Sequence, residues 1–230
     1  MTSHTAVPHL ALFDLDHTLL PIDSDYSWGQ FTQTLGWVEP QEFGRKNDEF
    51  FAHYQAGTLD IHDYVRFATE AFRNRPLDEA HAAHARFMRE VVQPAIQPQA
   101  LALLNKHRAA GHRIVIITAT NEFVTRPIAQ ALGVQELIAV ELERDAQGRY
   151  TGEILGIASM REGKVLRLQQ WLDAQGLDWV GVDSTFYSDS RNDLPLLERV
   201  NHPVATNPDA TLRAVATERG WPILDLFPKE

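Results

Sequence analysis

The sequence contains no cysteine, which excludes disulfide bonds and thiolate zinc sites. Basic residues are also few: 21 lysines and arginines stand against 31 aspartates and glutamates, for a formal net charge of -10. That balance argues against broad binding of nucleic acids or anionic membranes, and leaves room for a local basic pocket. No apolar run has the length needed to span a bilayer, and the first residues lack the basic start and long apolar core of a signal peptide. We therefore expect a soluble, cytoplasmic protein.

What the sequence does contain is an ordinary globular composition, with 44% hydrophobic and 23% charged residues in a chain of 230. This length suits one large domain, or one domain that carries an inserted subdomain. Nothing in the sequence indicates an oligomeric state.

Strand-like and helix-like segments alternate in the second half of the chain. Residues 9–16 (HLALFDLD) and 113–120 (RIVIITAT) are nearly unbroken apolar runs, as is typical of parallel strands covered on both faces. Helical patterns between the strands end at glycine, the residue expected just past a helix. The pattern predicts an α/β fold with a doubly wound parallel sheet. The weaker predicted strands cover 136–142, 184–190 and 202–207, the helices cover 99–110, 121–132 and 162–175, and a hairpin covers 143–154.

Residues 21–97 interrupt this alternation with no convincing strand and about four amphipathic helices. A segment of this length is too long for a plain loop. We expect an inserted all-helical subdomain here, on a core formed by residues 1–20 and 98–230. The insertion begins at the carboxyl end of the first strand, the edge where parallel sheets bind ligands. Its boundaries carry prolines, and we expect hinges at 21–24 and 94–99.

Two aspartates, Asp14 and Asp16, stand where the first apolar run ends. Buried unpaired carboxylates are unfavourable, and neighbouring ones repel each other, so their surroundings must supply a cation. Other polar residues follow later strands or begin a helix, and the topology would bring them to the same edge. Carboxylate oxygens gathered in this way suit Mg²⁺. These additional residues are Thr118, Lys164, Asp189, Asn192 and Asp193.

The ordered motifs Asp14-Leu-Asp16-His-Thr18, Thr118, Lys164 and Asp189-Ser-Arg-Asn-Asp193 resemble the haloacid dehalogenase superfamily of phosphatases. The helical insertion resembles the cap that follows the first motif in that superfamily. Within it, the sequence is most similar to the branch that contains phosphoserine phosphatase. Two residues depart from that branch: Ser190 replaces a glycine, and Thr118 replaces a serine that is normally followed by glycines.

The resemblance implies a Mg²⁺-dependent phosphomonoester hydrolase that acts on a small phosphorylated metabolite through an aspartyl phosphate. Asp14 would be the nucleophile, and Asp16 the general acid and base, which requires a pKa above the usual value of about 4. Asp14, the Asp16 backbone carbonyl and Asp189 would hold the metal. The implied phosphate-binding and supporting residues are Thr118, Lys164, Thr18, Asn192 and Asp193.

For the substrate, the resemblance points to Asp23, whose matching acidic residue in phosphoserine phosphatases would pair with an ammonium group. Asp23 could equally cap a helix that begins near Ser24. Phosphoserine would also need an arginine for its carboxylate. Histidinol phosphate needs none, and Trp28 would flank its imidazole. Both substrates remain open, and the candidate arginines for phosphoserine are Arg45, Arg66, Arg73 and Arg75.

Other interpretations compete with this one. The two early aspartates could simply cap a helix, and Lys164 could be a solvated helix residue. A phosphoryl-transferring mutase would share most of the mechanism. A non-catalytic, phosphorylatable signalling domain is less consistent, because such domains lack the paired aspartates and the cap. His81 and His84 are expected at the surface, and the aromatic residues at 43, 50, 51 and 54 in the core of the helical insertion.

Overall fold

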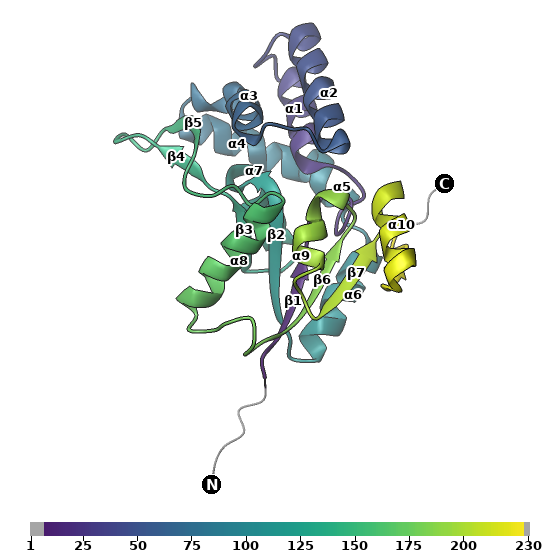
Figure 1. Cartoon of the computed structure of the whole chain (residues 1–230). Coiled ribbons are helices and arrows are strands. Elements are labelled where there is room, and N and C mark those ends of the chain that lie inside the picture. The colour runs from purple at the N-terminus through teal and green to yellow at the C-terminus, as the bar shows by residue number, and fades with distance from the viewer. Residues whose placement is uncertain (1–6, 228–230) are drawn as a thin grey trace.

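The computed structural model describes residues 7–227, and its centre is a six-stranded parallel sheet (Figure 1). The strand order is β3-β2-β1-β6-β7-β8, so the chain winds outward from β1 in one direction and later returns to wind in the other. The doubly wound parallel sheet is therefore confirmed. The strands are β1 (His9–Phe13), β2 (Arg113–Asn121), β3 (Glu136–Val140), β6 (Asp183–Ser188), β7 (His202–Thr206) and β8 (Ile223–Leu224).

Alternate residues of β1 enter two separate hydrophobic clusters, one on each face of the sheet. Ala11 and Phe13 pack with α6 and α7, whereas Leu10 and Leu12 pack with α8, α9 and α10. This is why the strand reads as an unbroken apolar run. The helices are α6 (Pro98–Ala109), α7 (Glu122–Ala131), α8 (Glu162–Ala174), α9 (Leu194–Leu197) and α10 (Ala210–Arg219).

A group of helices lies between β1 and α6 in the chain and covers the carboxyl end of the sheet (Figure 1). This is the predicted all-helical cap, whose boundaries at residues 21 and 97 remain a proposal. Among the described residues, no helix is long and apolar enough to cross a membrane. The cap comprises α1 (Ser24–Thr34), α2 (Pro40–Ala56), α3 (Ile61–Arg73), α4 (Leu77–Phe87), the π-helical turn η1 (Met88–Val92) and α5 (Gln93–Ala95).

The predicted hairpin is present, formed by β4 (Leu142–Arg144) and β5 (Tyr150–Ile154), but it joins the cap rather than the sheet. It lies beside α3 in Figure 1. Arg66 on α3 donates two hydrogen bonds to Glu153, with Nε–Oε1 and Nη2–Oε2 distances of 2.8 and 3.1 Å. A segment encoded after α7 therefore completes the packing of the cap.

Cap and core share one aromatic cluster, and Trp28 lies at its centre. The Trp28 ring is 5.3 Å from that of Phe87 and 5.8 Å from that of Phe123, and Phe72 stacks on Phe123 at 4.2 Å. Trp28 is only 1% exposed. The prediction that Trp28 flanks a substrate is therefore wrong, because packing between α1, α4 and α7 uses the whole ring.

Candidate active site

Asp14 follows β1 directly and extends its pairing, because its backbone N–H donates to the Tyr187 carbonyl on β6 at 2.9 Å. Lys164, near the start of α8, contacts the Asp14 side chain. The Lys164 Nζ atom lies 2.7 Å from Asp14 Oδ1 and 2.7 Å from Asp193 Oδ2. Ser188 donates a further hydrogen bond to Asp193 at 2.7 Å. All of these side chains are buried, so the lysine is a fixed positive charge between two carboxylates.

Burial disfavours the charged form of Lys164, but the carboxylates of Asp14 and Asp193 outweigh that effect and raise its pKa above the ordinary lysine value. The ammonium group is therefore permanently charged. Glycine at position 163 allows α8 to begin close to the loop that contains Ala158. A Cβ atom at residue 163 would lie 1.9 Å from the Ala158 carbonyl oxygen, so no side chain fits there.

Thr18 links Asp14 to the third expected acid, Asp189. Its hydroxyl oxygen is 3.4 Å from Asp14 Oδ2 and 3.2 Å from Asp189 Oδ1, and it accepts the Asp189 backbone N–H at 3.1 Å. Burial raises the pKa of Asp189 well above its ordinary value, and repulsion from Asp14 and Asp193 adds to the shift. Three carboxylates thus lie close together beside one lysine: Asp14 and Asp193 are buried and contact Lys164, and Asp189 is partly exposed.

This excess of buried negative charge is the observation that fits a divalent cation. Among residues 7–227, no three histidine or acidic side chains are arranged as a ready-made metal cluster. Mg²⁺ needs fewer protein ligands, because it is commonly held by one or two carboxylates and keeps several waters. The set that the sequence motifs indicate, Asp14, Asp189 and the Asp16 backbone carbonyl, has the oxygen ligands that such a site requires.

Asp16 lies in a different environment from Asp14. Its Oδ1 accepts the Ser24 backbone N–H at 2.7 Å, and its Oδ2 accepts the Thr120 hydroxyl at 2.9 Å. Burial raises the pKa of Asp16 to about 6, and repulsion from Asp23 contributes to the rise. No cation contacts its side chain within the described part of the chain. Asp16 is therefore held in position as a side chain that can carry a proton.

Thr118 lies at the carboxyl end of β2, two residues before Thr120. Its hydroxyl accepts the Thr120 backbone N–H at 3.1 Å, and its carbonyl accepts the Ser159 hydroxyl at 2.6 Å. Both threonines line the same pocket as Asp14 and Asp16. Thr120 was missed in the sequence, although alternation along a strand places residues two apart on one face.

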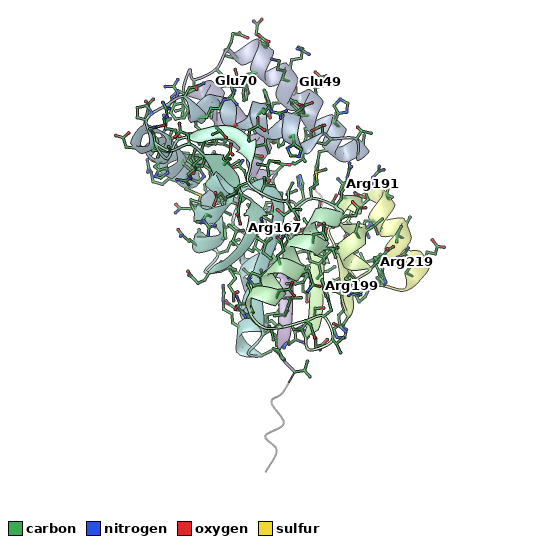
Figure 2. The ribbon with its side chains drawn as sticks, turned by 60° about the vertical axis from the view of Figure 1, so that its left-hand side comes forward. Glu49, Glu70, Arg167, Arg191, Arg199 and Arg219 are labelled. Carbon is green, nitrogen blue, oxygen red and sulfur yellow. The ribbon has the colours of Figure 1, made fainter. Side chains whose placement is uncertain are left out.

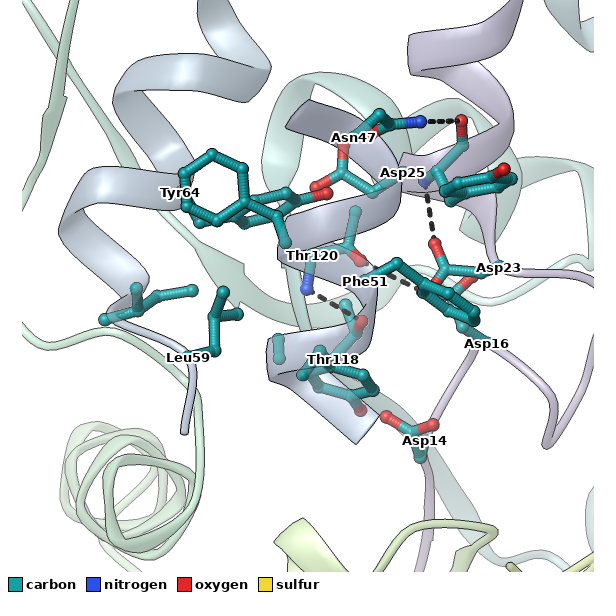
Figure 3. A pocket seen from close by; sticks show the side chains of 15 residues that line it. Asp14, Asp16, Asp23, Asp25, Asn47, Phe51, Leu59, Tyr64, Thr118 and Thr120 are labelled. Carbon is teal, nitrogen blue, oxygen red and sulfur yellow. Dashed lines mark hydrogen bonds between the residues drawn. The ribbon is translucent and has the colours of Figure 1, made fainter. Parts of the chain in front are cut away.

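The pocket extends from Asp14 toward the cap and is lined by four aspartates (Figure 3). Asp23 caps α1 by accepting the Tyr26 backbone N–H at 2.8 Å, yet it also lines the pocket. The two alternatives for Asp23 are therefore compatible. Burial raises the pKa of Asp23. Asp25, two residues further along, was not singled out in the sequence and lies at the end of the pocket opposite Asp14.

Aromatic side chains of the cap line the rest of this pocket: Tyr26, Phe50, Phe51, Tyr54 and Tyr64. Of the α2 aromatic residues expected in the cap core, Phe43 lies there against Phe67 at 4.4 Å, and Phe50 packs on the same ring at 5.0 Å. Phe50, Phe51 and Tyr54 also line the pocket, so the expectation holds only in part. No arginine or lysine is among the described residues that line it. The four candidate arginines of the cap lie elsewhere, three of them in ion pairs with Glu49, Glu79 and Glu153.

The carboxyl end of α2 is fastened to the core beside the site. Asn192 Nδ2 donates to the Tyr54 carbonyl at 3.0 Å, and Arg191 Nη2 donates to the Ala56 carbonyl at 2.6 Å. Arg161 donates to the Gly57 carbonyl. Figure 2 shows Arg191 at the junction between the cap helices and the core. We call these three contacts the α2 latch. The Asn192 amide, expected near phosphate or water, is one of its members.

Comparison with known proteins places this arrangement in a family. The sequence is 41% identical over 218 residues to a histidinol-phosphatase of Neisseria meningitidis, covering 94% of this chain and 98% of that one. A crystal structure of a protein of unknown function from Bordetella pertussis has a TM-score of 0.91 and 47% identity, covering 96% and 100% of the two chains. A substrate-bound phosphoserine phosphatase shares the fold, with a TM-score of 0.67 at 16% identity, over 95% of this chain and 93% of that one. The haloacid dehalogenase-like hydrolase family matches residues 11–198, and the chain belongs to that family.

Proposed function

We propose that this protein is a Mg²⁺-dependent phosphatase for a small phosphate ester that carries an ammonium group, with histidinol phosphate as the preferred substrate. Its family and its similarity to a histidinol-phosphatase make it a phosphatase of small phosphorylated metabolites. The observation that carries the finer assignment is the pocket lining, which offers four aspartates and aromatic rings but no arginine. A cationic substrate fits that lining, whereas the carboxylate of phosphoserine would meet repulsion.

The proposed reaction begins with Asp14. Its carboxylate oxygen attacks phosphorus, the bond from phosphorus to the ester oxygen breaks, and an aspartyl phosphate forms. Lys164, which touches the same carboxylate, reduces the repulsion between the nucleophile and the phosphate dianion. The Thr118 hydroxyl binds a phosphoryl oxygen. When bound, Mg²⁺ supplies further charge neutralisation and orients the phosphoryl group.

Asp16 moves the protons in both steps. In its protonated form it gives a proton to the departing alkoxide, so the amino alcohol leaves with a neutral hydroxyl group and keeps its ammonium group. The resulting carboxylate then removes a proton from the water that attacks the aspartyl phosphate, and Asp14 is regenerated as inorganic phosphate leaves. Thr120 and the Ser24 backbone N–H hold the Asp16 side chain on the pocket side of Asp14.

Phosphate release from histidinol phosphate, phosphoserine and p-nitrophenyl phosphate tests this proposal. We expect wild-type enzyme to hydrolyse histidinol phosphate with the highest kcat/KM and to need Mg²⁺. Asp14→Asn keeps the shape of the side chain but removes its nucleophilic charge, and should abolish turnover. Wild-type rates in that variant would contradict the mechanism, and isomerisation without phosphate release would identify a mutase.

The contribution of Asp23 is tested on a matched pair of esters, 2-aminobutyl phosphate and butyl phosphate. If Asp23 pairs with the ammonium group, Asp23→Asn reduces kcat/KM about 10- to 100-fold for the aminated ester and much less for the other, as expected for one hydrogen bond to a charged group. Equal losses on both esters would leave Asp23 with its role as the cap of α1 alone.

A further inference from the structure

We propose that Asp25, oriented by Asn121, is the residue that recognises the second nitrogen-bearing group of the substrate, the imidazole ring of histidinol phosphate. This inference rests on the proposed function and extends it. Asp25 belongs to the first turn of α1 and is 5% exposed, yet it lines the catalytic pocket. No step of the chemistry uses it, and a buried carboxylate is unfavourable unless something compensates it.

Asn121 has its orientation fixed by the start of α7. Its Oδ1 accepts the Val124 backbone N–H at 3.2 Å, so its Nδ2 group must point the other way. That group donates to Asp25 Oδ1 at 3.2 Å. The Tyr64 side chain on α3 lines the same pocket, where burial and the nearby Asp25 raise the pKa of its hydroxyl. Asn121 thus holds the Asp25 carboxyl group at the pocket wall.

Burial raises the pKa of Asp25 to about 8, and repulsion from Asp23 adds to the shift. Without substrate the group is therefore mostly protonated at neutral pH. A carboxyl group in this state can donate a hydrogen bond to one ring nitrogen, or lose its proton and pair with an imidazolium. Either arrangement gives the Asp25 carboxyl group a partner in addition to Asn121, and an uncharged apolar tail would supply none.

The positions along the pocket agree with the connectivity of the substrate. Asp14, where phosphorus binds, lies at one end in Figure 3, Asp23 lies between, and Asp25 lies at the far end near Asn47. In histidinol phosphate the ammonium-bearing carbon separates the phosphate ester from the carbon that bears the ring. Phe50 and Tyr64 both line the pocket, and their rings contact each other edge to face at 5.5 Å, so they form one aromatic wall. A flat heteroaromatic ring can pack against such a wall.

The test compares histidinol phosphate with 2-aminobutyl phosphate, which keeps the ammonium group and lacks the ring. In Asp25→Asn, the ratio of kcat/KM for the two substrates should fall about 10- to 100-fold relative to wild type, mainly through KM, as expected for one lost hydrogen bond to a charged group. Asp63→Asn serves as the matched control. Asp63 is an exposed residue of α3 outside the pocket, paired only with Arg66 at 3.0 Å, and its substitution should leave the ratio unchanged.

Calorimetric binding of histidinol itself provides a readout that needs no turnover. Wild type should bind histidinol at least about tenfold more tightly than Asp25→Asn, and Tyr64→Phe should fall between them. Unchanged histidinol affinity in a folded Asp25→Asn protein, or equal losses on both phosphate esters, would overturn the inference. A protein that hydrolyses 2-aminobutyl phosphate through Asp14 but shows no effect at Asp25 would keep the proposed phosphatase function and refute only this residue's role.

Discussion

Asp14 and Asp16 are two residues apart, yet their side chains have different partners. Asp14 contacts the Lys164 ammonium group and shares the Thr18 hydroxyl with Asp189. Asp16 receives only a backbone N–H and the Thr120 hydroxyl. Burial raises the pKa of Asp14 to about 7 and that of Asp16 to about 6. The Lys164 ammonium group opposes the rise at Asp14 and favours its charged form, whereas no such cation contacts Asp16.

This division predicts opposite phenotypes for two substitutions. Asp16→Asn should lower kcat by about 10²–10⁴, the usual contribution of general acid–base catalysis, and should keep Mg²⁺ affinity, since the expected metal contact is its backbone carbonyl. Asp189→Ala should instead lose Mg²⁺ affinity. Stopped-flow phosphate release and calorimetric Mg²⁺ titration measure the two properties separately. A folded Asp16→Asn protein that no longer binds Mg²⁺ would contradict the assignment.

Residues in the sequence motifs could be predicted individually, because most follow a strand that ends at the same sheet edge and Lys164 begins a helix. The structure brings Asp14, Thr18, Lys164, Asp189 and Asp193 together there. Asn121 and Asp25 were missed for a different reason. Their role depends on how α1 of the cap lies against α7, and no local pattern of residues encodes the contact between two helices distant in the chain.

At the scale of elements, the contact between α4 and α7 contains a histidine that sequence reasoning placed at the surface. His84 is 4% exposed, and its Nε2–H donates to the Val124 carbonyl at 3.1 Å. His81 is exposed, as expected. Burial lowers the pKa of His84 to about 4, and the neighbouring His81 adds to the shift. Helical spacing alone could not separate the two, because only the position of α7 decides which histidine it covers.

His84 therefore makes the junction sensitive to acid. The folded-state pKa of His84 is below its unfolded value of 6.5, so at pH values between the two the unfolded chain binds more protons than the folded protein does. The free energy of unfolding therefore falls as pH decreases through this window. Between pH 7 and pH 5 the loss is about 2 kcal/mol. His84→Gln keeps an N–H donor without titrating. Urea denaturation at both pH values should show a pH dependence about 2 kcal/mol smaller in the variant than in wild type. Equal dependence in both proteins would refute this assignment.

At the scale of the whole molecule, the cap is attached on two sides. The aromatic cluster around Trp28 and Phe123 joins α1 and α4 to α7 through apolar contact. The α2 latch on the other side consists of a few polar contacts to backbone carbonyls. Packed aromatic rings resist separation more than single hydrogen bonds do. Opening of the site is therefore expected at the α2 latch, with the proposed hinges at 21–24 and 94–99 accommodating the movement.

Arg191→Ala tests this expectation, because it removes the donor to the Ala56 carbonyl. Loss of one hydrogen bond of about 1 kcal/mol should increase opening about fivefold. Amide hydrogen exchange at the carboxyl end of α2 should accelerate accordingly, and selectivity for histidinol phosphate over p-nitrophenyl phosphate should decrease. Arg199→Ala is the matched control, since Arg199 lies over Trp179 at 4.9 Å, away from the latch. Exchange rates at α2 that match the control would exclude the latch as the opening side.

The hairpin of β4 and β5 has a consequence for the order in which the molecule folds. The apolar sides of α1 and α3 are completed by Phe123 and Tyr150, which the ribosome adds long after the cap helices. Contacts between residues this far apart in the sequence form late, because the chain between them must first close into a loop. During synthesis the cap therefore remains unfinished, with apolar surface exposed, until the hairpin has emerged. The sheet is completed later still, because β6, β7 and β8 follow the hairpin in the chain.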